Sequence, residues 1–175
     1  MKKPTLLFVA AALMIAMSSV ASAQTASGTL TVTANVQSTM KLVFNTDATG
    51  IALGGSGTSA ASIALGTVQA FGGTTPTNVT NTTLANAFRL DTAFDINVQV
   101  ANVTSTSYNL TAQLGAADGN TWQIGGVGVT AAAASPILAS GTYATDTRLA
   151  FALTIPFAAP AGSISNTISF VASPN

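Results

Sequence analysis

Residues 29–44 read TLTVTANVQSTMKLVF, and an apolar side chain stands at every second position of this run except Ser38. A period of two predicts a β-strand with one apolar face. At roughly 3.3 Å per residue the run would be about 50 Å long, well beyond a usual strand of about 3–10 residues. We therefore divide it at Ser38 into an N-terminal arm and, after Ser38, the first strand of a folded domain.

The rest of the sequence predicts an all-β fold, because alternation recurs and no convincing amphipathic helix is present. Strands are predicted at residues 63–71, 84–90, 94–100, 108–114, 149–157 and 164–172, with short strands beginning at Trp122 and spanning Val127 to Val129. Segments typical of turns separate them at 50–59, 72–83 and 118–120. We expect 94–100 and 108–114 to form an antiparallel pair. About eight or nine short strands are typical of a β-sandwich or a small barrel.

The N-terminus predicts export. Lys2 and Lys3 precede a short apolar stretch at 6–17, and Ala21-Ser22-Ala23 forms an A-x-A cleavage site. We therefore expect a signal peptide at 1–23, an N-terminal arm at 24–38 and a β-sandwich domain at 39–175. No later run reaches the roughly 18 continuous apolar residues that a spanning helix requires, so the mature chain is expected to have no membrane span.

Charge and cysteine content exclude several classes of partner and fold. Without residues 1–23, three basic residues remain against five aspartates, a net charge of −2. So few cations cannot neutralise several phosphates, which argues against nucleic acid as a partner. Cysteine is absent, so the fold cannot be a disulfide scaffold. The low charge also gives little protection against self-association.

The sequence offers little for catalysis. It has no His and no Cys, the residues that usually activate or supply a nucleophile, and no Glu, so zinc lacks its preferred ligands. Lys41 falls on the polar phase of its strand and is interpreted as a solvated charge. The oxygens of Asp91, Asp95, Asp118 and Asn120 leave calcium open as a minor alternative to plain turns, although no EF-hand spacing is present. We predict no enzyme, no metal site and no cofactor.

Segments near both ends of the chain carry motifs of small and apolar residues. Residues 28–38 read GTLTVTANVQS, residues 65–67 read LGT and residues 161–170 read AGSISNTISF. In these segments the chain resembles the spore coat protein U-like secreted pilins, the subunits of archaic chaperone–usher pili. Met40 stands about where those pilins usually carry a cysteine, and related cysteine-free secreted β-sandwich families fit almost as well.

The resemblance implies an immunoglobulin-like β-sandwich that lacks its last strand and is completed by donor-strand exchange with a neighbouring subunit. It implies a structural role in an extracellular pilus or fibre that supports surface adhesion or biofilm formation. The implied partners are other copies of the chain or related pilins, a periplasmic chaperone and an outer-membrane usher. The chain would pass through the periplasm and end at the cell surface.

The residues supply a physical reason for the same arrangement. A missing strand leaves an apolar groove and unpaired backbone groups, and an incoming strand satisfies both through main-chain hydrogen bonds and alternate side chains. The candidate donor side chains with the required spacing are those of Leu30, Val32, Ala34 and Val36.

Two other interpretations are weighed against this one. In the first, the N-terminal run folds back into its own sheet and the chain is a self-contained secreted β-sandwich that acts as a binding or matrix module. The second, an eight-stranded outer-membrane barrel, is disfavoured because one Trp and two Tyr are few for the aromatic girdles of such barrels.

Overall fold

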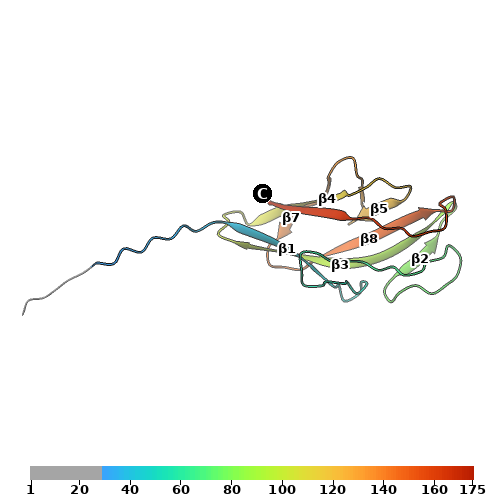
Figure 1. The fold of residues 1–175 in the computed structure, drawn as a ribbon, viewed down its shortest axis with the longest axis horizontal. Helices are drawn as coiled ribbons and strands as arrows, with labels where there is room; N and C mark the ends of the chain where they lie inside the picture. The colour runs from blue at the N-terminus through green and yellow to red at the C-terminus, as the bar shows by residue number, and fades with distance from the viewer. Residues whose placement is uncertain (1–28) are drawn as a thin grey trace, which may run out of the picture. The chain divides into compact units, whose positions relative to one another are not determined.

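The computed structural model describes residues 29–175 (Figure 1). The expected signal peptide and the arm residues 24–28 lie outside the described residues. The chain divides into two units after Asn35, and the second unit begins at Val36. Residues 29–38 belong to no strand, and their side chains are exposed. Among the described residues, no helix has the length and hydropathy needed to cross a membrane.

Residues 29–175 contain nine strands, all paired antiparallel, and no helix, which confirms the all-β prediction. The larger sheet has the order β1-β3-β8-β5-β6, with β2 also paired to β3, and the smaller sheet has the order β7-β4-β9. The strands are β1 (Thr39–Asn45), β2 (Thr80–Thr83), β3 (Ala87–Ala101), β4 (Ser107–Leu114), β5 (Thr121–Ile124), β6 (Val127–Val129), β7 (Ser135–Thr142), β8 (Thr147–Pro156) and β9 (Ile168–Pro174).

Both sheets contribute to one hydrophobic core. Alternate residues of β3 are buried, so that Leu90, Ile96 and Val98 have no exposed surface. Tyr108 and Leu110 of β4 are equally buried and belong to the same cluster. Because one core draws on the inner faces of both sheets, the sheets form two layers. The alternation of apolar residues in each strand is the direct cause, since it gives each sheet one apolar face.

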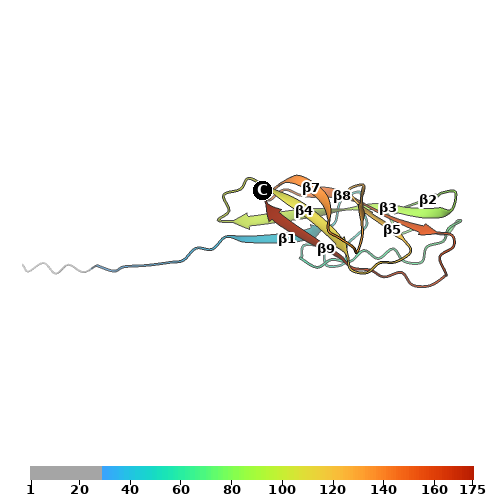
Figure 2. The ribbon, with the colours of Figure 1, turned by 90° about the horizontal axis from the view of Figure 1, so that it is seen from above.

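The long strand β3 defines two ends of the folded unit, because Thr39 pairs with Ala101 at one end and Pro156 pairs with Ala87 at the other. We call these the Thr39 end and the Pro156 end. β1 and β2 share one edge of β3, with β1 towards the Thr39 end. Figures 1 and 2 show β4, β7 and β9 gathered towards the Thr39 end, while β2 and the last residues of β8 lie at the Pro156 end.

The predicted pairing of residues 94–100 with 108–114 is wrong. The first segment lies in β3 of the larger sheet and the second in β4 of the smaller sheet. β1 and β8 occupy the two edges of β3, and the connection to β4 crosses between the layers, starting at Asn102 with a left-handed φ of 58°. The crossing lets the apolar faces of β3 and β4 cover one another instead of lying side by side in one sheet.

The predicted strand at 63–71 is also wrong, because no described residue between 63 and 71 belongs to a strand. Ile63, Leu65 and Val68 are partly buried against the core. The alternating apolar residues therefore belong to a loop that packs on the core. The backbone of this loop does not pair with a neighbouring strand.

Other boundaries differ from the prediction in ways the residues explain. The predicted strands at 84–90 and 94–100 are one continuous strand, β3. β2 lies within the predicted connection at 72–83, because its sequence TNTT carries no apolar side chain that would reveal it. β7 was not predicted, since Pro136 and Gly141 interrupt any alternation. The last strand begins at Ile168 rather than near Ile164. The short strands β5 and β6 are confirmed.

Gly141 of β7 tests how tightly the ring of Tyr108 packs over the neighbouring strand of the smaller sheet. A Cβ atom at this position would overlap the ring of the buried Tyr108. We predict that Gly141→Ala lowers the free energy of unfolding by about 1–3 kcal/mol, the usual cost of overpacking a core. The measurement is urea unfolding at neutral pH.

Gly128→Ala in β6 is the matched control, because a Cβ there meets no atom within 4 Å. It should leave stability unchanged within about 0.5 kcal/mol, as surface substitutions usually do. Equal stability of Gly141→Ala and the natural chain would contradict the packing described.

Candidate binding groove

A groove of about 1330 Å³ with an apolar floor lies between β1 and β9. Met40, Leu42 and Phe44 of β1 line one side, and residues 162–170 line the other. Met40 pairs with Val100 and Ile155 pairs with Phe88, so the groove follows thirteen residues of β3. At roughly 3.3 Å per residue, this length corresponds to about 40 Å. The groove therefore connects the Thr39 end with the Pro156 end.

The floor of the groove is the inner face of the larger sheet. Its side chains come from β3, β5 and β8, and all of them are less than a tenth exposed. They are Leu90, Phe94, Trp122, Ile124, Phe151, Leu153 and Ile155. An apolar floor of this kind favours an occupant with apolar side chains.

The strands on both sides of the groove have an unpaired edge. Among the described strands, β1 is hydrogen-bonded only to β3, and β9 only to β4. Phe44 at the end of β1 does find partners on its free side, since its N–H donates to the carbonyl of Thr58 and its carbonyl accepts from the N–H of Gly57. Met40 and Leu42 share the direction of Phe44, because every second residue of a strand points its backbone groups to the same side. These groups are open to an added strand.

Three aromatic rings join the two sheets beside the groove. Phe170 of β9 lies 5.3 Å from Phe44 of β1 and 6.0 Å from Phe94 of β3, measured between ring centroids. Both contacts are edge-to-face, the geometry that aromatic pairs favour. The cluster fixes the spacing between the two groove edges near the middle of β3.

Segment 162–167, one wall of the groove, is held by a side-chain network. Asn166 donates to Asp118 Oδ2 at 3.2 Å and to the carbonyl of Ala116 at 2.8 Å. Trp122 Nε1, from the groove floor, donates to Asp118 Oδ1 at 3.0 Å. Asp118 therefore couples the wall to the floor, and its Asp-Gly-Asn sequence also forms the predicted turn, with the Asn120 N–H donating to Asp118 Oδ1.

The electrostatics of Asp118 follow from this network. Burial favours the neutral acid, but the hydrogen bonds from Trp122, Asn120 and Asn166 outweigh burial and hold the pKa of Asp118 below its ordinary value. The charged form is thus the one that the folded wall stabilises.

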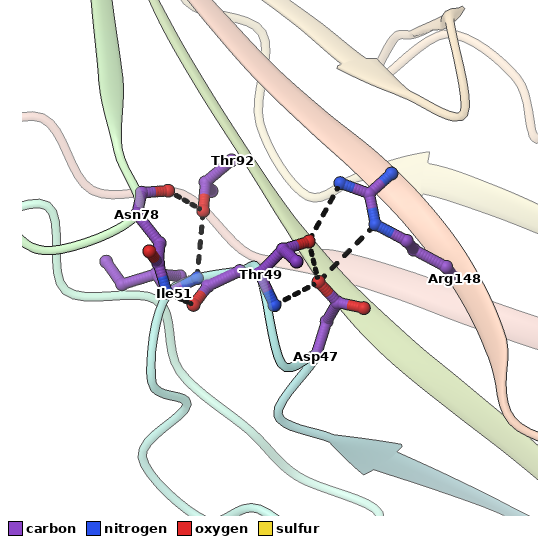
Figure 3. A network of polar contacts seen from close by, with 7 residues as sticks. Asp47, Thr49, Ile51, Asn78, Thr92 and Arg148 are labelled. Atoms are coloured by element: carbon purple, nitrogen blue, oxygen red, sulfur yellow. Dashed lines mark hydrogen bonds and ion pairs between the residues drawn. The ribbon is translucent and has the colours of Figure 1, made fainter.

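A second polar network fixes the loop after β1 against β3 and β8 (Figure 3). The Thr49 hydroxyl donates to Asp47 Oδ1 at 2.6 Å, and Arg148 Nε lies 3.4 Å from the same oxygen. The Thr49 hydroxyl bond, followed by the backbone bond from Thr49 and the Arg148 charge, holds the pKa of Asp47 below its ordinary value although burial opposes this. Thr92 completes the network by accepting from the Ile51 N–H at 2.9 Å. The arrangement anchors a loop.

The remaining aspartates are engaged in side-chain contacts or lie apart. Asp91 is paired with Arg89 at 2.6 Å, and Asp146 Oδ1 accepts hydrogen bonds from the side-chain amides of Asn45 and Asn97. Burial, reinforced by the charges of Asp47 and Asp146, raises the pKa of Asp95. Within residues 29–175, no group of three acidic residues is arranged to hold a metal ion.

The structure does not bring the candidate donor side chains into this groove. Leu30, Val32 and Val36 are 89%, 80% and 68% exposed, and Ala34 is exposed as well. Sequence analysis identified these four side chains but not the groove residues. The signal for the groove was present in β1, β8 and the C-terminal strand, whose apolar faces were predicted, but their relative placement was not.

Comparisons with models of known families, with curated proteins and with solved structures give no match. The interpretation of the groove therefore depends on its own geometry and on the motifs quoted above.

The lowered pKa of Asp118 gives a test of the wall. A group whose pKa is depressed on folding adds stability above its unfolded pKa, which is about 3.9 for Asp, and loses that contribution as pH falls through the folded value. We predict that Asp118→Asn unfolds at lower urea concentration than the natural chain at pH 7, and that the difference narrows as the pH falls below the unfolded pKa of about 3.9 and through the lower folded pKa.

The emission of Trp122, the one tryptophan of the chain, reports the transition. Asp91→Asn serves as control, because Asp91 contacts the exposed Arg89 on the opposite face of the sheet and surface pairs contribute about 0–1 kcal/mol. A gap between natural chain and Asp118→Asn that stays constant from pH 7 to pH 2.5 would contradict the coupling.

Proposed function

We propose that this chain is a structural subunit of an extracellular fibre, in which the arm at 24–38 of one copy fills the groove of another copy. In this proposal the folded unit is an immunoglobulin-like β-sandwich that lacks one strand, and donor-strand exchange supplies it. The observation that carries the proposal is the long groove with an apolar floor between the unpaired edges of β1 and β9. A fibre of this kind would serve surface adhesion or biofilm formation.

The arm has the side-chain pattern that the groove requires. Leu30, Val32, Ala34 and Val36 fall on one face of an extended strand, and Thr or Asn residues fall on the other. Burying a Leu or Val side chain is worth about 1.5–3 kcal/mol, so the exposed Leu30, Val32 and Val36 would gain most from entering the groove. The polar face of the arm would remain towards solvent.

The lengths of arm and groove also agree. The groove follows thirteen residues of β3, and an arm of residues 24–38 in extended form would span about 50 Å at roughly 3.3 Å per residue. The arm can therefore run the length of the groove with residues to spare for a link to its own domain. Main-chain hydrogen bonds to β1 and β9 would satisfy both free edges.

The proposed assembly also accounts for the expected partners. An open groove with an apolar floor is an aggregation hazard before it is filled, so a periplasmic chaperone would cover it and an outer-membrane usher would exchange the chaperone for the arm of another subunit. A signal peptide at 1–23 would deliver the chain to that compartment. Because residues 29–38 belong to neither sheet, they are free to act as donor for another copy.

The first test changes one arm residue on each face. We predict that Val32→Asp abolishes assembly of a chain expressed from Gln24, because a charge would be buried in the apolar floor. Thr31→Asp carries the same charge on the polar face and should assemble like the natural chain. Assembly is measured by size-exclusion chromatography and by heat-resistant ladders on gels, because strand exchange gives kinetic stability.

Equal assembly of Val32→Asp and Thr31→Asp would contradict the proposal. A soluble monomer of the natural chain that is stable and does not assemble would instead favour the self-contained sandwich.

The second test fills the groove within one chain. Asn175 follows Pro174, which pairs with Tyr108 at the Thr39 end, so the C-terminus lies next to one end of the groove. We predict that residues 25–37, appended after Asn175 through a short Gly/Ser linker to a chain carrying Val32→Asp in its own arm, yield a monomer. Its Tm should rise by about 10 °C or more, at about 2–4 °C per kcal/mol for a domain of this size.

The matched control carries Val32→Asp in the appended copy as well, and its Tm should stay at the level of the chain without the appendage. Scanning calorimetry measures both chains. Equal Tm values for the two fusions would show that the appended segment does not occupy the groove.

A further inference from the structure

Apolar side chains gather in the open at the Pro156 end of the folded unit. Phe71 is 71% exposed, Leu84 is 42% exposed and Phe157 is 38% exposed. The rings of Phe71 and Phe157 pack on one another with centroids 5.3 Å apart. We call these three residues the end patch. Nothing in the groove or in the polar networks uses them.

The end patch is held in place by the backbone around it. The Phe157 N–H donates to the carbonyl of Asn86 at 3.0 Å, and the Leu84 N–H donates to the carbonyl of Ala87 at 2.8 Å. The Thr83 hydroxyl donates to the carbonyl of Ala70, next to Phe71, at 3.2 Å. A surface fixed in this way loses little conformational entropy when a partner binds.

A hollow of about 490 Å³ lies at the same end, lined by Pro156, Pro160 and Ile164 among others. Ile164 also lines the groove. Phe157 comes two residues after Ile155, which is on the groove floor, and two residues span at most about 7 Å. The end patch and the hollow therefore flank the end of the groove.

The direction of growth identifies the occupant. The arm of each copy joins its own domain at the Thr39 end, where Asn102 Nδ2 donates to the carbonyl of Gln37 at 3.3 Å. Suppose that the arm of a second copy left the groove at the Thr39 end. The domain of that second copy would then collide with the place where the first copy's own arm begins. If the arm of the second copy leaves at the Pro156 end, the Thr39 end stays free and the fibre can continue. The second domain is therefore expected at the Pro156 end.

The link between a bound arm and its domain is too short to keep the two domains apart. Only Gln37 and Ser38 separate Val36 from β1, so the second domain begins within about 11 Å of the groove exit. The segments that form most of the two surfaces, residues 69–88, 101–107 and 157–167, contain no Lys, Arg or Asp. An uncharged contact of aromatic and small side chains has no charge to desolvate.

We propose that the end patch binds the Thr39 end of the next copy of this chain, and we call this interface the seat. In the seat, residues 37–39 and the 102–106 loop of the next copy contact Phe71, Leu84 and Phe157. The proposal rests on the proposed function, because it takes its partner from donor-strand exchange. It adds a second interface, outside the groove, that sets the angle and stiffness between successive subunits.

The test compares assembly with groove binding. Phe71→Ser with Phe157→Ser, in a chain expressed from Gln24, should slow the formation of multimers at least tenfold, as measured by light scattering. Val171→Ser removes an exposed apolar side chain that lies outside both the end patch and the groove lining, and it should assemble at the natural rate. Equal rates for the double variant and the natural chain would overturn the seat.

A second measurement separates the seat from the groove. A synthetic peptide of residues 25–37 is added to the Val32→Asp chain with and without Phe71→Ser and Phe157→Ser, and Trp122 emission reports its binding. Equal peptide affinity together with slowed assembly supports the seat. A tenfold loss of peptide affinity in the double variant would overturn it, because the end patch would then act through the groove. Failure of the peptide to bind either chain would overturn the proposed function and the seat with it.

Disulfide trapping tests the contact directly, because the chain has no cysteine of its own. Phe71→Cys and Thr104→Cys in one chain lie at opposite ends of β3 and cannot join within a copy. Oxidation of assembled chains should add covalent multimers to the ladder on non-reducing gels, and a thiol reductant should remove them. A ladder that is the same with and without the reductant would overturn the seat.

Discussion

The structure depends on the need to cover an apolar sheet face that is longer than the sheet opposite it. β3 has 15 residues, whereas β4, the central strand of the smaller sheet, has 8. Three strands gathered towards the Thr39 end therefore cannot cover the inner faces of β3 and β8 along their whole length. Loops cover part of the remainder, among them residues 59–68, and the space that they leave is the groove. The proposed function, the polar anchors and the end patch are all consequences of this mismatch.

The loops that border the groove are fixed by hydrogen bonds from neutral side chains more than by ion pairs. Asn166 and Trp122 converge on Asp118, and Thr49 and Arg148 converge on Asp47. Hydrogen bonding of this kind suits a chain with few charges, because each of these two aspartates accepts hydrogen bonds from several donors. It also leaves the sheet edges with little protection. Lys41 is the one lysine on β1, whereas isolated edge strands are usually guarded by charge, proline or a bulge. The proposed function requires edges that are open in this way.

The sequence predicted the burial of side chains better than their partners. Alternation in β4 and β8 correctly indicated which side chains enter the core, because burial depends on the period of each strand alone. It could not show that β4 leaves the sheet of β3, because that depends on the crossing at Asn102 and on both edges of β3 being occupied. Residues 63–71 show the converse error, since a loop lying on the core produces the same spacing as a strand.

The same difference between local patterns and long-range contacts applies to the candidate site. The candidate donor side chains of the arm could be named from their spacing, because the pattern that a donor strand would need is local. The groove combines side chains from β1, β3, β5, β8 and the C-terminal segment, and only the fold brings these together. Phe71 and Phe157 are the extreme case. They are 86 residues apart in sequence and their contact has no local signature, so the end patch could not have been predicted.

The alternation that spans residues 29–44 also explains why the arm is available at all. The alternation keeps the same phase from Val36 through Ser38 to Met40. If the arm continued β1 in the same register, it would need to pair with an extension of β3, the neighbour of β1. That neighbour ends where β1 begins, because Ala101 is the last residue of β3 and pairs with Thr39. Asn102 then turns the chain away towards the smaller sheet. In the larger sheet the first half of the pattern therefore has no strand beside it along the line of β1. Four alternating apolar side chains and a backbone outside both sheets are what the proposed assembly requires of a donor, which would pair with the edges of β1 and β9 in a second copy.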